Sequence, residues 1–338
     1  MNYKKRPPQP DRNQLLVQAH SAMAPTILIA GATGNTGRPL TEILPSLLQT
    51  SNLSDHRIIA LTRSLTSPAA KDLAKLPGVE VIEQNWVEIT ADWLKEHQVV
   101  RAFIASHNEP NQFAEESTFL FNALDAGVKY VVRISTTAAN VRPDCKAYYP
   151  RSHWAIENLL SQPEFAALQW TSLQPNVFMN FWFASAVDLI KQYRQTGQQS
   201  PLRLMVAKDT PVGIIDASEV GVFAAHLLAQ SDVSAHNQAK YVLNGPEDIT
   251  GQQIVDLVEQ HIGTKVDEVI YQDTSAIDLL WEYKYKALCQ SKNVIGTTKY
   301  AVETAWEGKC STSTTSKEFL QFAGPKIRPA DALNALLE

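Results

Sequence analysis

Apolar runs alternate with amphipathic stretches along the first half of the chain. The stretches between the runs repeat apolar positions at helical spacing over Asn35–Leu48, Ser67–Lys75 and Phe113–Ala126. Alternating strands and helices predict βαβ units, and therefore a parallel sheet with helices on both faces. The apolar runs that we interpret as buried strands are Thr26–Ala30, Arg57–Thr62, Val79–Glu83, Val99–Ala105 and Tyr130–Ser135.

The pattern loosens beyond residue 150. We predict helices over Arg151–Ser161, Ala217–Ala229 and Thr250–His261, with short strands at Trp170–Leu173 and Tyr241–Asn244. The whole is an α/β fold: a doubly wound parallel sheet over residues 25–175, interleaved with a smaller, mixed C-terminal region over 176–338 that shapes a substrate pocket. Residues 1–24 are basic and proline-containing and lack the apolar centre of a secretory signal, so we expect a mobile tail.

Composition narrows the functional classes. The 338 residues are 44% hydrophobic and 19% charged, and their net charge of −5 argues against a nucleic-acid-binding face. Cys145, Cys289 and Cys310 lie far apart without a CxxC pair, so we expect no disulfide framework, no metal site and a reducing compartment, the cytoplasm. No apolar run is long enough to cross a membrane.

A glycine-rich loop joins the first strand to the first helix in ILIAGATGNTGRPL, residues 27–40. A helix that begins directly after a strand presents free N–H groups and the positive end of its dipole, which attract anions. Glycines let a pyrophosphate approach the backbone closely. The loop therefore predicts a dinucleotide site formed by Gly31, Thr33, Gly34, Asn35, Thr36 and Gly37.

The end of the second predicted strand bears on which dinucleotide binds. An acidic residue there is typical of NAD sites, whereas arginine accommodates the additional phosphate of NADP. The chain has Thr62-Arg63-Ser64 at this point and no acidic residue until Asp72. Arg63 therefore favours NADP(H), with a solvated surface arginine as the alternative.

Three motifs together carry a family resemblance: GATGNTG, the pair Thr62-Arg63, and HWAIENLL followed by LQPNVFMNF. Over about residues 26–325 the chain resembles the NmrA-like family of atypical short-chain dehydrogenases/reductases. The resemblance implies a Rossmann-type fold whose glycine loop binds pyrophosphate. It further implies contacts to adenine, to the nicotinamide ribose and beneath the nicotinamide from Asn85, Trp86, Ser106, His107, Val177, Phe178 and Asn180.

The chain departs from the family pattern at one position. His153 stands where the family usually has a lysine that contacts the nicotinamide ribose, four residues after Tyr149. Ser135 and Thr136 end the fifth predicted strand, where related reductases keep a hydroxyl near the substrate carbonyl. His153 is either a proton donor or a ribose and core hydrogen-bonding residue, and Tyr149 is either a proton donor or a packing residue. Tyr148 serves equally well if the register shifts by one residue.

Two functional hypotheses from different classes follow. The first is an NADPH-dependent oxidoreductase that transfers hydride to or from a small carbonyl-type or unsaturated substrate, aromatic ones included, with Ser135, Tyr149 and His153 as candidate catalytic residues. The second is a non-catalytic NADP(H) sensor that acts through a protein partner. Asp216 with Glu219 is interpreted as a helix capping box. Candidates for an aromatic pocket wall are Phe178, Phe181, Trp182, Phe183, Trp281 and Tyr283.

Overall fold

The computed structural model describes residues 24–279, 283 and 291–338. The tail predicted for residues 1–24 therefore lies outside the described residues, apart from its last residue. Trp281 and Cys289 also lie outside them.

A seven-stranded parallel sheet forms the centre of the molecule, in the order β3-β2-β1-β4-β5-β6-β8. Every neighbouring pair of strands is parallel. The predicted doubly wound α/β architecture is thus confirmed, and the order reverses direction between β1 and β4. The strands are β1 (Thr26–Ala30), β2 (Arg57–Thr62), β3 (Val79–Glu83), β4 (Val99–Ile104), β5 (Tyr130–Ile134), β6 (Gln169–Pro175) and β8 (Ala239–Leu243).

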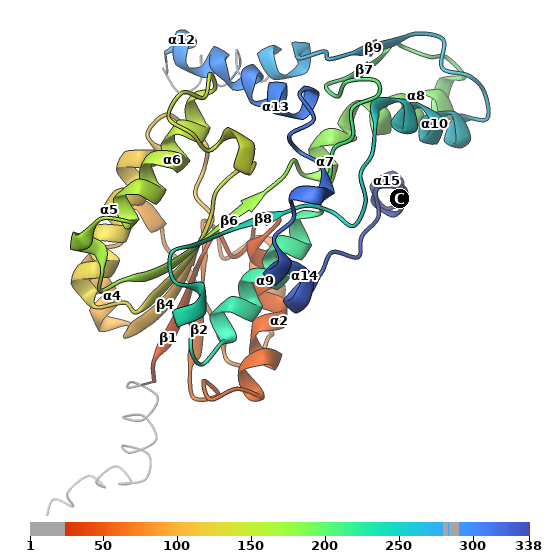
Figure 1. Ribbon diagram of the computed structural model, residues 1–338. Helices are drawn as coiled ribbons and strands as arrows, with labels where there is room; N and C mark the ends of the chain where they lie inside the picture. Colours follow the sequence, from red (N-terminus) through yellow and green to blue (C-terminus); the bar gives the residue numbers. More distant parts are fainter. Residues whose placement is uncertain (1–23, 280–282, 284–290) are drawn as a thin grey trace, which may run out of the picture.

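Helices cover both faces of the sheet (Figure 1). Side chains alternate along each strand, so on β1 Ile27 and Ile29 belong to one apolar core, while Leu28 belongs to the other. The first core is covered by α2 (Gly37–Gln49), α9 (Ala217–Ala229) and α14 (Lys317–Ala323). The second is covered by α4 (Ala91–Glu96), α5 (Gln112–Ala126) and α6 (Tyr148–Leu160). The short helix α3 (Pro68–Leu73) joins β2 to β3.

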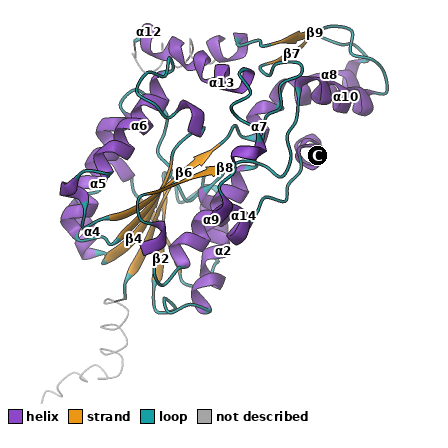
Figure 2. Ribbon diagram, viewed as in Figure 1, coloured by secondary structure: helices purple, strands orange, loops and turns teal. Residues whose placement is uncertain are grey.

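The C-terminal region adds elements beyond the carboxyl edge of the sheet (Figure 2). Its own apolar core is separate from the two that flank the sheet. The same region also supplies β8 and α9, so residues from both halves of the chain build the central layer. Its remaining elements are α7 (Met179–Trp182), α8 (Ala184–Thr196), β7 (Leu202–Leu204), α10 (Gly251–Ile262), β9 (Val269–Tyr271), α12 (Lys292–Ile295), the 3-10 helix η5 (Gly296–Val302), α13 (Glu303–Trp306) and α15 (Pro329–Leu337).

Two local predictions need correction. Helix α6 begins at Tyr148 instead of Arg151, which places both neighbouring tyrosines in its first turn. Asp216 caps α9 by accepting a hydrogen bond from the backbone N–H of Ser218, but Glu219 does not complete a capping box. Its carboxylate instead accepts hydrogen bonds from the backbone N–H groups of Lys326 and Ile327, because the C-terminal segment passes directly over it.

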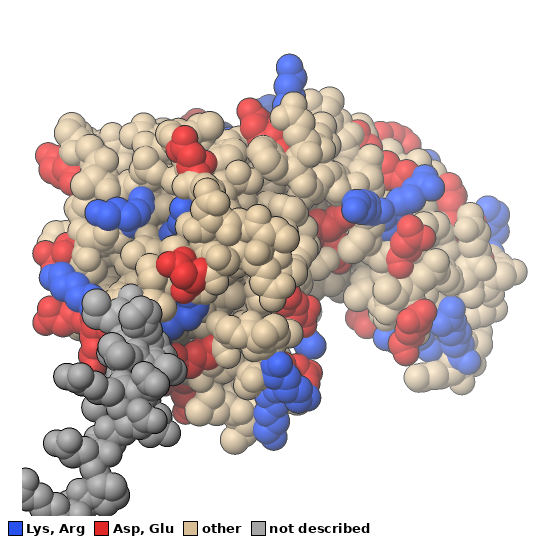
Figure 3. All heavy atoms as spheres, turned by 90° about the horizontal axis from the view of Figure 1, so that it is seen from below, with Lys and Arg blue, Asp and Glu red and all other residues tan. Residues whose placement is uncertain are grey.

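Charged side chains of both signs are interspersed on the face of the molecule seen in Figure 3. Among the described residues, no helix has the length and apolar character needed to cross a membrane.

Candidate functional site

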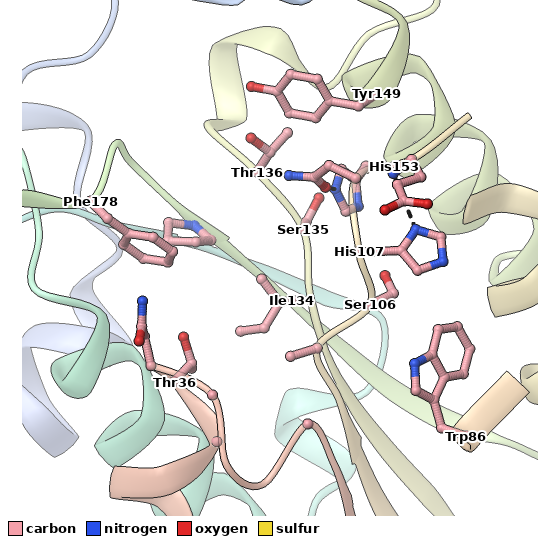
Figure 4. A pocket seen from close by; sticks show the side chains of 18 of the residues that line it. Thr36, Trp86, Ser106, His107, Ile134, Ser135, Thr136, Tyr149, His153 and Phe178 are labelled. Atoms are coloured by element: carbon pink, nitrogen blue, oxygen red, sulfur yellow. Dashed lines mark hydrogen bonds between the residues drawn. The ribbon is translucent and has the colours of Figure 1, made fainter. Parts of the chain in front are cut away.

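A pocket of about 870 Å³ opens at the carboxyl edge of the sheet (Figure 4). The segments that follow β1, β2, β4, β5 and β6 converge there, and residues of the C-terminal region close it. This is the point where the strand order reverses, and open α/β sheets bind their ligands at such points. Of the predicted site residues, those that line the pocket are Gly31, Thr33, Gly34, Asn35, Thr36, Gly37, Arg63, Asn85, Trp86, Ser106, His107, Ser135, Tyr149, His153, Val177 and Phe178.

The three glycines of the loop are needed for different structural reasons. Gly31 has a φ of +90°, which favours glycine, and a Cβ on Gly37 would lie 2.1 Å from the carbonyl oxygen of Gly31. A Cβ on Gly34 would meet only that same oxygen, at 3.3 Å. The protein's own packing thus requires Gly31 and Gly37, whereas Gly34 leaves open space on the pocket side. Helix α2 begins there without a side-chain cap and without an acidic residue in its first turn, as suits an anion site.

Arg63 directly follows β2 at the rim of the pocket. Its side chain is exposed and makes no ion pair with any residue that the structure describes. Arg38, in the first turn of α2, is in contrast already paired with Glu42 at 2.8 Å. Arg63 therefore keeps its guanidinium available for an anionic ligand.

The middle wall of the pocket is built on β4 and the start of α5. Ser106 Oγ donates a hydrogen bond to Glu116 Oε2 at 2.5 Å. The ring of His107 accepts from the backbone N–H of Glu109 through Nδ1, so its proton is on Nε2, which donates to Glu115 Oε2 at 2.5 Å. The ring of Trp86 lies 6.0 Å from that of His107. This wall therefore presents rings and hydrogen-bonded polar groups held in fixed orientations.

The deep end of the pocket brings together Ser135 and Thr136, which directly follow β5, and Tyr149 and His153 from α6 (Figure 4). Ser135 Oγ is buried and has no hydrogen-bond partner among the described residues. Burial raises the pKa of Tyr149 to about 12, while a hydrogen bond with the side chain of Thr136 opposes that rise. Tyr149 therefore keeps its phenolic proton at neutral pH.

His153 is fully buried in the wall behind these groups, with 1% of its surface exposed. Its Nδ1 lies 2.8 Å from a guanidinium nitrogen of Arg133, and its Nε2 lies 3.1 Å from Asn108 Oδ1. Burial, together with the nearby charge of Arg133, lowers the pKa of His153 well below the ordinary value. The imidazole is therefore neutral at neutral pH.

Asn180 is the predicted cofactor contact that the structure places outside the pocket wall. It is exposed on the first turn of α7, where its side-chain oxygen accepts from the backbone N–H of Phe181. Asn176, four residues earlier, lines the pocket instead. Its buried amide donates to the carbonyl oxygens of Gly213 and Cys310 and to the Asn244 side chain, which ties β6 to the C-terminal region.

The aromatic prediction holds for two residues of its set. Phe178 and Phe181 line the pocket, whereas Trp182 and Phe183 are buried in the C-terminal core. Tyr283 is 75% exposed.

Several functional candidates escaped the sequence reasoning. His153 contacts Arg133 and Gln112, and Arg133 in turn pairs with Glu116. The sequence indicated this group in one way: a charged arginine inside an otherwise apolar strand requires buried partners. The residues that close the pocket from the C-terminal region gave no periodic signal; they are Ile277, Thr298, Ala301 and Val302. Within the described part of the chain, no three potential metal-ligating side chains gather in one place.

The fold and the pocket together define a Rossmann-type α/β protein. The chain belongs to the NmrA-like family, whose model matches residues 23–320. No curated protein sequence matches it.

Solved structures show the same fold at low identity. An NADPH-dependent quinone oxidoreductase from Escherichia coli, complexed with NADPH, has a TM-score of 0.68 at 20% identity, covering 92% of this chain and 100% of that chain. Triphenylmethane reductase from Citrobacter sp., complexed with NADP(H), has a TM-score of 0.64 at 18% identity, with the same coverage. NmrA, a negative transcriptional regulator, in complex with NADP, has a TM-score of 0.60 at 16% identity, covering 93% of this chain and 91% of that chain. The group thus contains both oxidoreductases and a regulator.

Proposed function

We propose that the protein is an NADPH-dependent oxidoreductase acting on a small carbonyl-type or unsaturated substrate. The observation that carries the proposal is one continuous pocket with an open glycine loop at one end and an unpartnered buried hydroxyl at the other. Gly34 and Ser135 mark these two ends. An unpartnered buried hydroxyl is unfavourable unless a ligand completes its hydrogen bonding.

The residues present fit NADP(H). The open space at Gly34 and the uncapped start of α2 suit the pyrophosphate, and the unpaired Arg63 suits the additional phosphate of NADP through a charge-assisted contact. A bound NADPH would supply the hydride. The wall residues Asn85, Trp86, Ser106, His107, Val177 and Phe178 would flank its adenine, ribose and nicotinamide.

The chain's own groups at the deep end supply hydrogen bonds and the proton. Ser135 Oγ would donate a hydrogen bond to the substrate oxygen, because nothing described nearby uses that hydroxyl. Tyr149 would deliver its phenolic proton to the same oxygen as negative charge develops there. With a pKa of about 12, it can protonate a strongly basic oxyanion. His153 would act as a neutral hydrogen-bond donor, because an imidazolium is unfavourable beside Arg133.

The pocket wall on the substrate side favours an apolar, uncharged substrate body. Phe178, Phe181 and Ile277 border it, and Ala301 and Val302 close it. Aromatic carbonyl compounds and conjugated enones or quinones match this surface. The thiols of Cys145 and Cys310 are buried and form no disulfide with any described residue, which supports a proposed cytoplasmic location.

The test is NADPH consumption measured across a panel of quinones, aldehydes and enones, with the wild type beside Tyr149→Phe. We expect consumption with part of the panel and a strong loss in the variant. Consumption that both proteins share equally would leave an enzyme but remove Tyr149 as the proton donor.

A non-catalytic NADP(H) sensor that signals to a protein partner is the second candidate. The observation that favours it is the neutral His153 where the family usually has lysine, since a neutral ring can hold a ribose without activating Tyr149. Tight NADPH binding with no consumption across the whole panel would establish this alternative in place of the enzyme.

A further inference from the structure

Arg133 is a charged residue in the middle of the sheet. It belongs to β5, and its side chain is completely buried. Its Nε donates to Glu116 Oε1 at 2.6 Å, and a second nitrogen lies 3.6 Å from Glu157 Oε1 and donates to Ser172 Oγ at 2.9 Å. The remaining terminal nitrogen is the one that faces His153. The guanidinium thus uses two of its nitrogens for the carboxylates and Ser172 and its third for the imidazole.

This contact determines where the ring proton of His153 lies. Arginine carries only donors, so Nδ1 at 2.8 Å must accept with its lone pair. A neutral imidazole then has its single proton on Nε2, which lies 3.1 Å from the acceptor oxygen of Asn108. The side-chain nitrogen of Gln112 lies 3.3 Å from both ring nitrogens and so favours neither tautomer. Asn108 lines the same pocket as His153.

We propose that Arg133 is a positioning residue that locks His153 as a neutral ring with its proton on Nε2, directed at Asn108 and the pocket wall. The inference rests on the proposed function only in treating Asn108, which lines the pocket, as the group that would pass this orientation on to a bound ribose. In this arrangement Arg133 on β5 orients the N–H of His153 on α6. The family usually has a single lysine at the position of His153, which needs no second residue to orient it.

The charges around His153 are already balanced without a proton on it. Arg133 from β5 faces Glu116 from α5 and Glu157 from α6, and Lys240 from β8 pairs with Glu157 Oε2 at 3.3 Å. Two cations therefore meet two anions. The other groups facing the ring are the uncharged Gln112 from α5, Asn108 from the preceding loop, and Tyr149 from α6. A proton on His153 would add an unbalanced charge in a buried site.

The test is nitrogen NMR of the protein labelled with ¹⁵N at its histidine rings, recorded without cofactor. His153 signals are assigned by their loss in His153→Gln. In the wild type we expect the Nε2–H tautomer and no titration between about pH 5.5 and 8.5. An Nδ1–H tautomer, or titration near the ordinary value of about 6.5, would overturn the proposal.

The variant that tests Arg133 is the double substitution Arg133→Gln with Glu116→Gln, which removes one charge of each sign. We expect the buried ring of His153 to stay neutral but to populate both tautomers, because no guanidinium then requires Nδ1 to accept. An unchanged His153 spectrum in the folded double variant would show that Arg133 does not set the tautomer. If the double variant does not fold, the single variant Arg133→Lys replaces it, because lysine keeps the charge but not the fixed fork of donors, and an unchanged His153 spectrum there would equally overturn the proposal.

Arg101 offers a matched control. It is a second strand arginine, 8% exposed on β4, but it donates to the carbonyl oxygens of Leu228 and Gln230 at the end of α9. Arg101→Gln should lower stability and leave the His153 signals as in the wild type. A shift of those signals of the same size as in the double variant would reduce Arg133 to a general structural role. Because these spectra need no NADPH, they can fail while NADPH consumption succeeds, and the reverse.

Discussion

The two ends of the pocket are built in opposite ways. At the glycine loop, the backbone forms the site, and the side chain that is absent from Gly34 leaves the space for a ligand. At the deep end, side chains form the site, and the buried pair of Arg133 and Glu116 holds His153 from behind.

The difference separates what short sequence motifs can encode from what they cannot. The loop depends on residues that are neighbours in the chain, so the motif GATGNTG is enough to predict an anion-binding loop. The deep end depends on Glu116, Arg133, His153 and Glu157, which come from three elements and meet only after the sheet has formed. Substitutions at the two ends should therefore fail in different ways.

The largest effect is expected at the loop. Gly34→Val should abolish binding of NADPH and NADH alike, because a branched side chain would fill the space where a pyrophosphate approaches the backbone. The variant should remain folded, since only the carbonyl oxygen of Gly31 lies near a Cβ there, at 3.3 Å, and it needs to shift by only a few tenths of an ångström. Isothermal titration with both cofactors and a circular dichroism spectrum check this.

Gly37→Val is the contrasting variant. Its Cβ would lie 2.1 Å from the carbonyl oxygen of Gly31, so it should lose stability as well as binding. Micromolar NADPH binding by the Gly34 variant would refute the assignment of the loop to a dinucleotide.

The next effect is expected at the deep end. Tyr149→Phe should lower turnover by ~10²–10⁴-fold, which is the contribution of a positioned proton donor, while NADPH affinity changes little. Steady-state kinetics on an accepted substrate, beside direct measurement of NADPH binding, separate the two quantities. Equal losses in turnover and in affinity would indicate that the tyrosine only packs.

A smaller effect should appear at the rim. Arg63→Ala removes a charged contact worth ~1.5–3 kcal/mol, so NADPH affinity should fall roughly tenfold or more while NADH affinity stays the same. Arg38→Ala is the matched control, because Arg38 already pairs with Glu42 at 2.8 Å. The same loss for both cofactors in the Arg63 variant would make Arg63 a structural residue.

The smallest effect concerns stability against pH. The pKa of His153 in the folded protein lies well below its ordinary value, because of burial and Arg133. As the pH falls below about 6.5, the unfolded chain takes up a proton that the folded chain does not, so the free energy of unfolding falls. This one group contributes a slope of at most ~1.4 kcal/mol per pH unit.

Urea unfolding of the wild type and of His153→Gln, at about pH 7.5 and about pH 5.5, measures this contribution. The wild type should lose more stability than the variant between the two conditions. Parallel losses would mean that His153 titrates normally in the folded protein.

Much of the sheet could be predicted because its central strands are buried on both faces. Such strands are continuous apolar runs, and the predicted bounds of Thr26–Ala30 and Arg57–Thr62 agree with β1 and β2. The bounds of Val79–Glu83 also agree with β3, although this edge strand is only partly buried and carries two exposed glutamates. The bounds of the later strand β6 were predicted less well. Strand β6 runs from Gln169 to Pro175, longer than predicted at both ends, because its polar residues are buried by partners distant in the sequence.

The site was predictable where local sequence controls the backbone and unpredictable where distant elements meet. The sequence could not distinguish Asn176 from Asn180, since both follow β6 and only the tertiary hydrogen bonds of Asn176 determine which one turns inward. Thr298 and Val302 belong to a 3-10 helix too short to show any periodicity. The sequence shows that Arg133 is a charged residue in an apolar strand, but it does not show which residues pair with it.

The seventh strand has a consequence for how the protein is made. Strand β8 ends at Leu243 and pairs with β6, which ends at Pro175, so 68 residues must be synthesised between the two. At ordinary translation rates this takes roughly 3 to 14 seconds, during which one edge of β6 has no strand beside it. Helix α9 is synthesised in the same interval, and its Gly221 packs so closely on Thr36 that a Cβ would lie 2.2 Å from that carbonyl oxygen. The helix behind the glycine loop therefore gains its neighbour late, and the free edge of β6 is covered only after residue 243 has been synthesised.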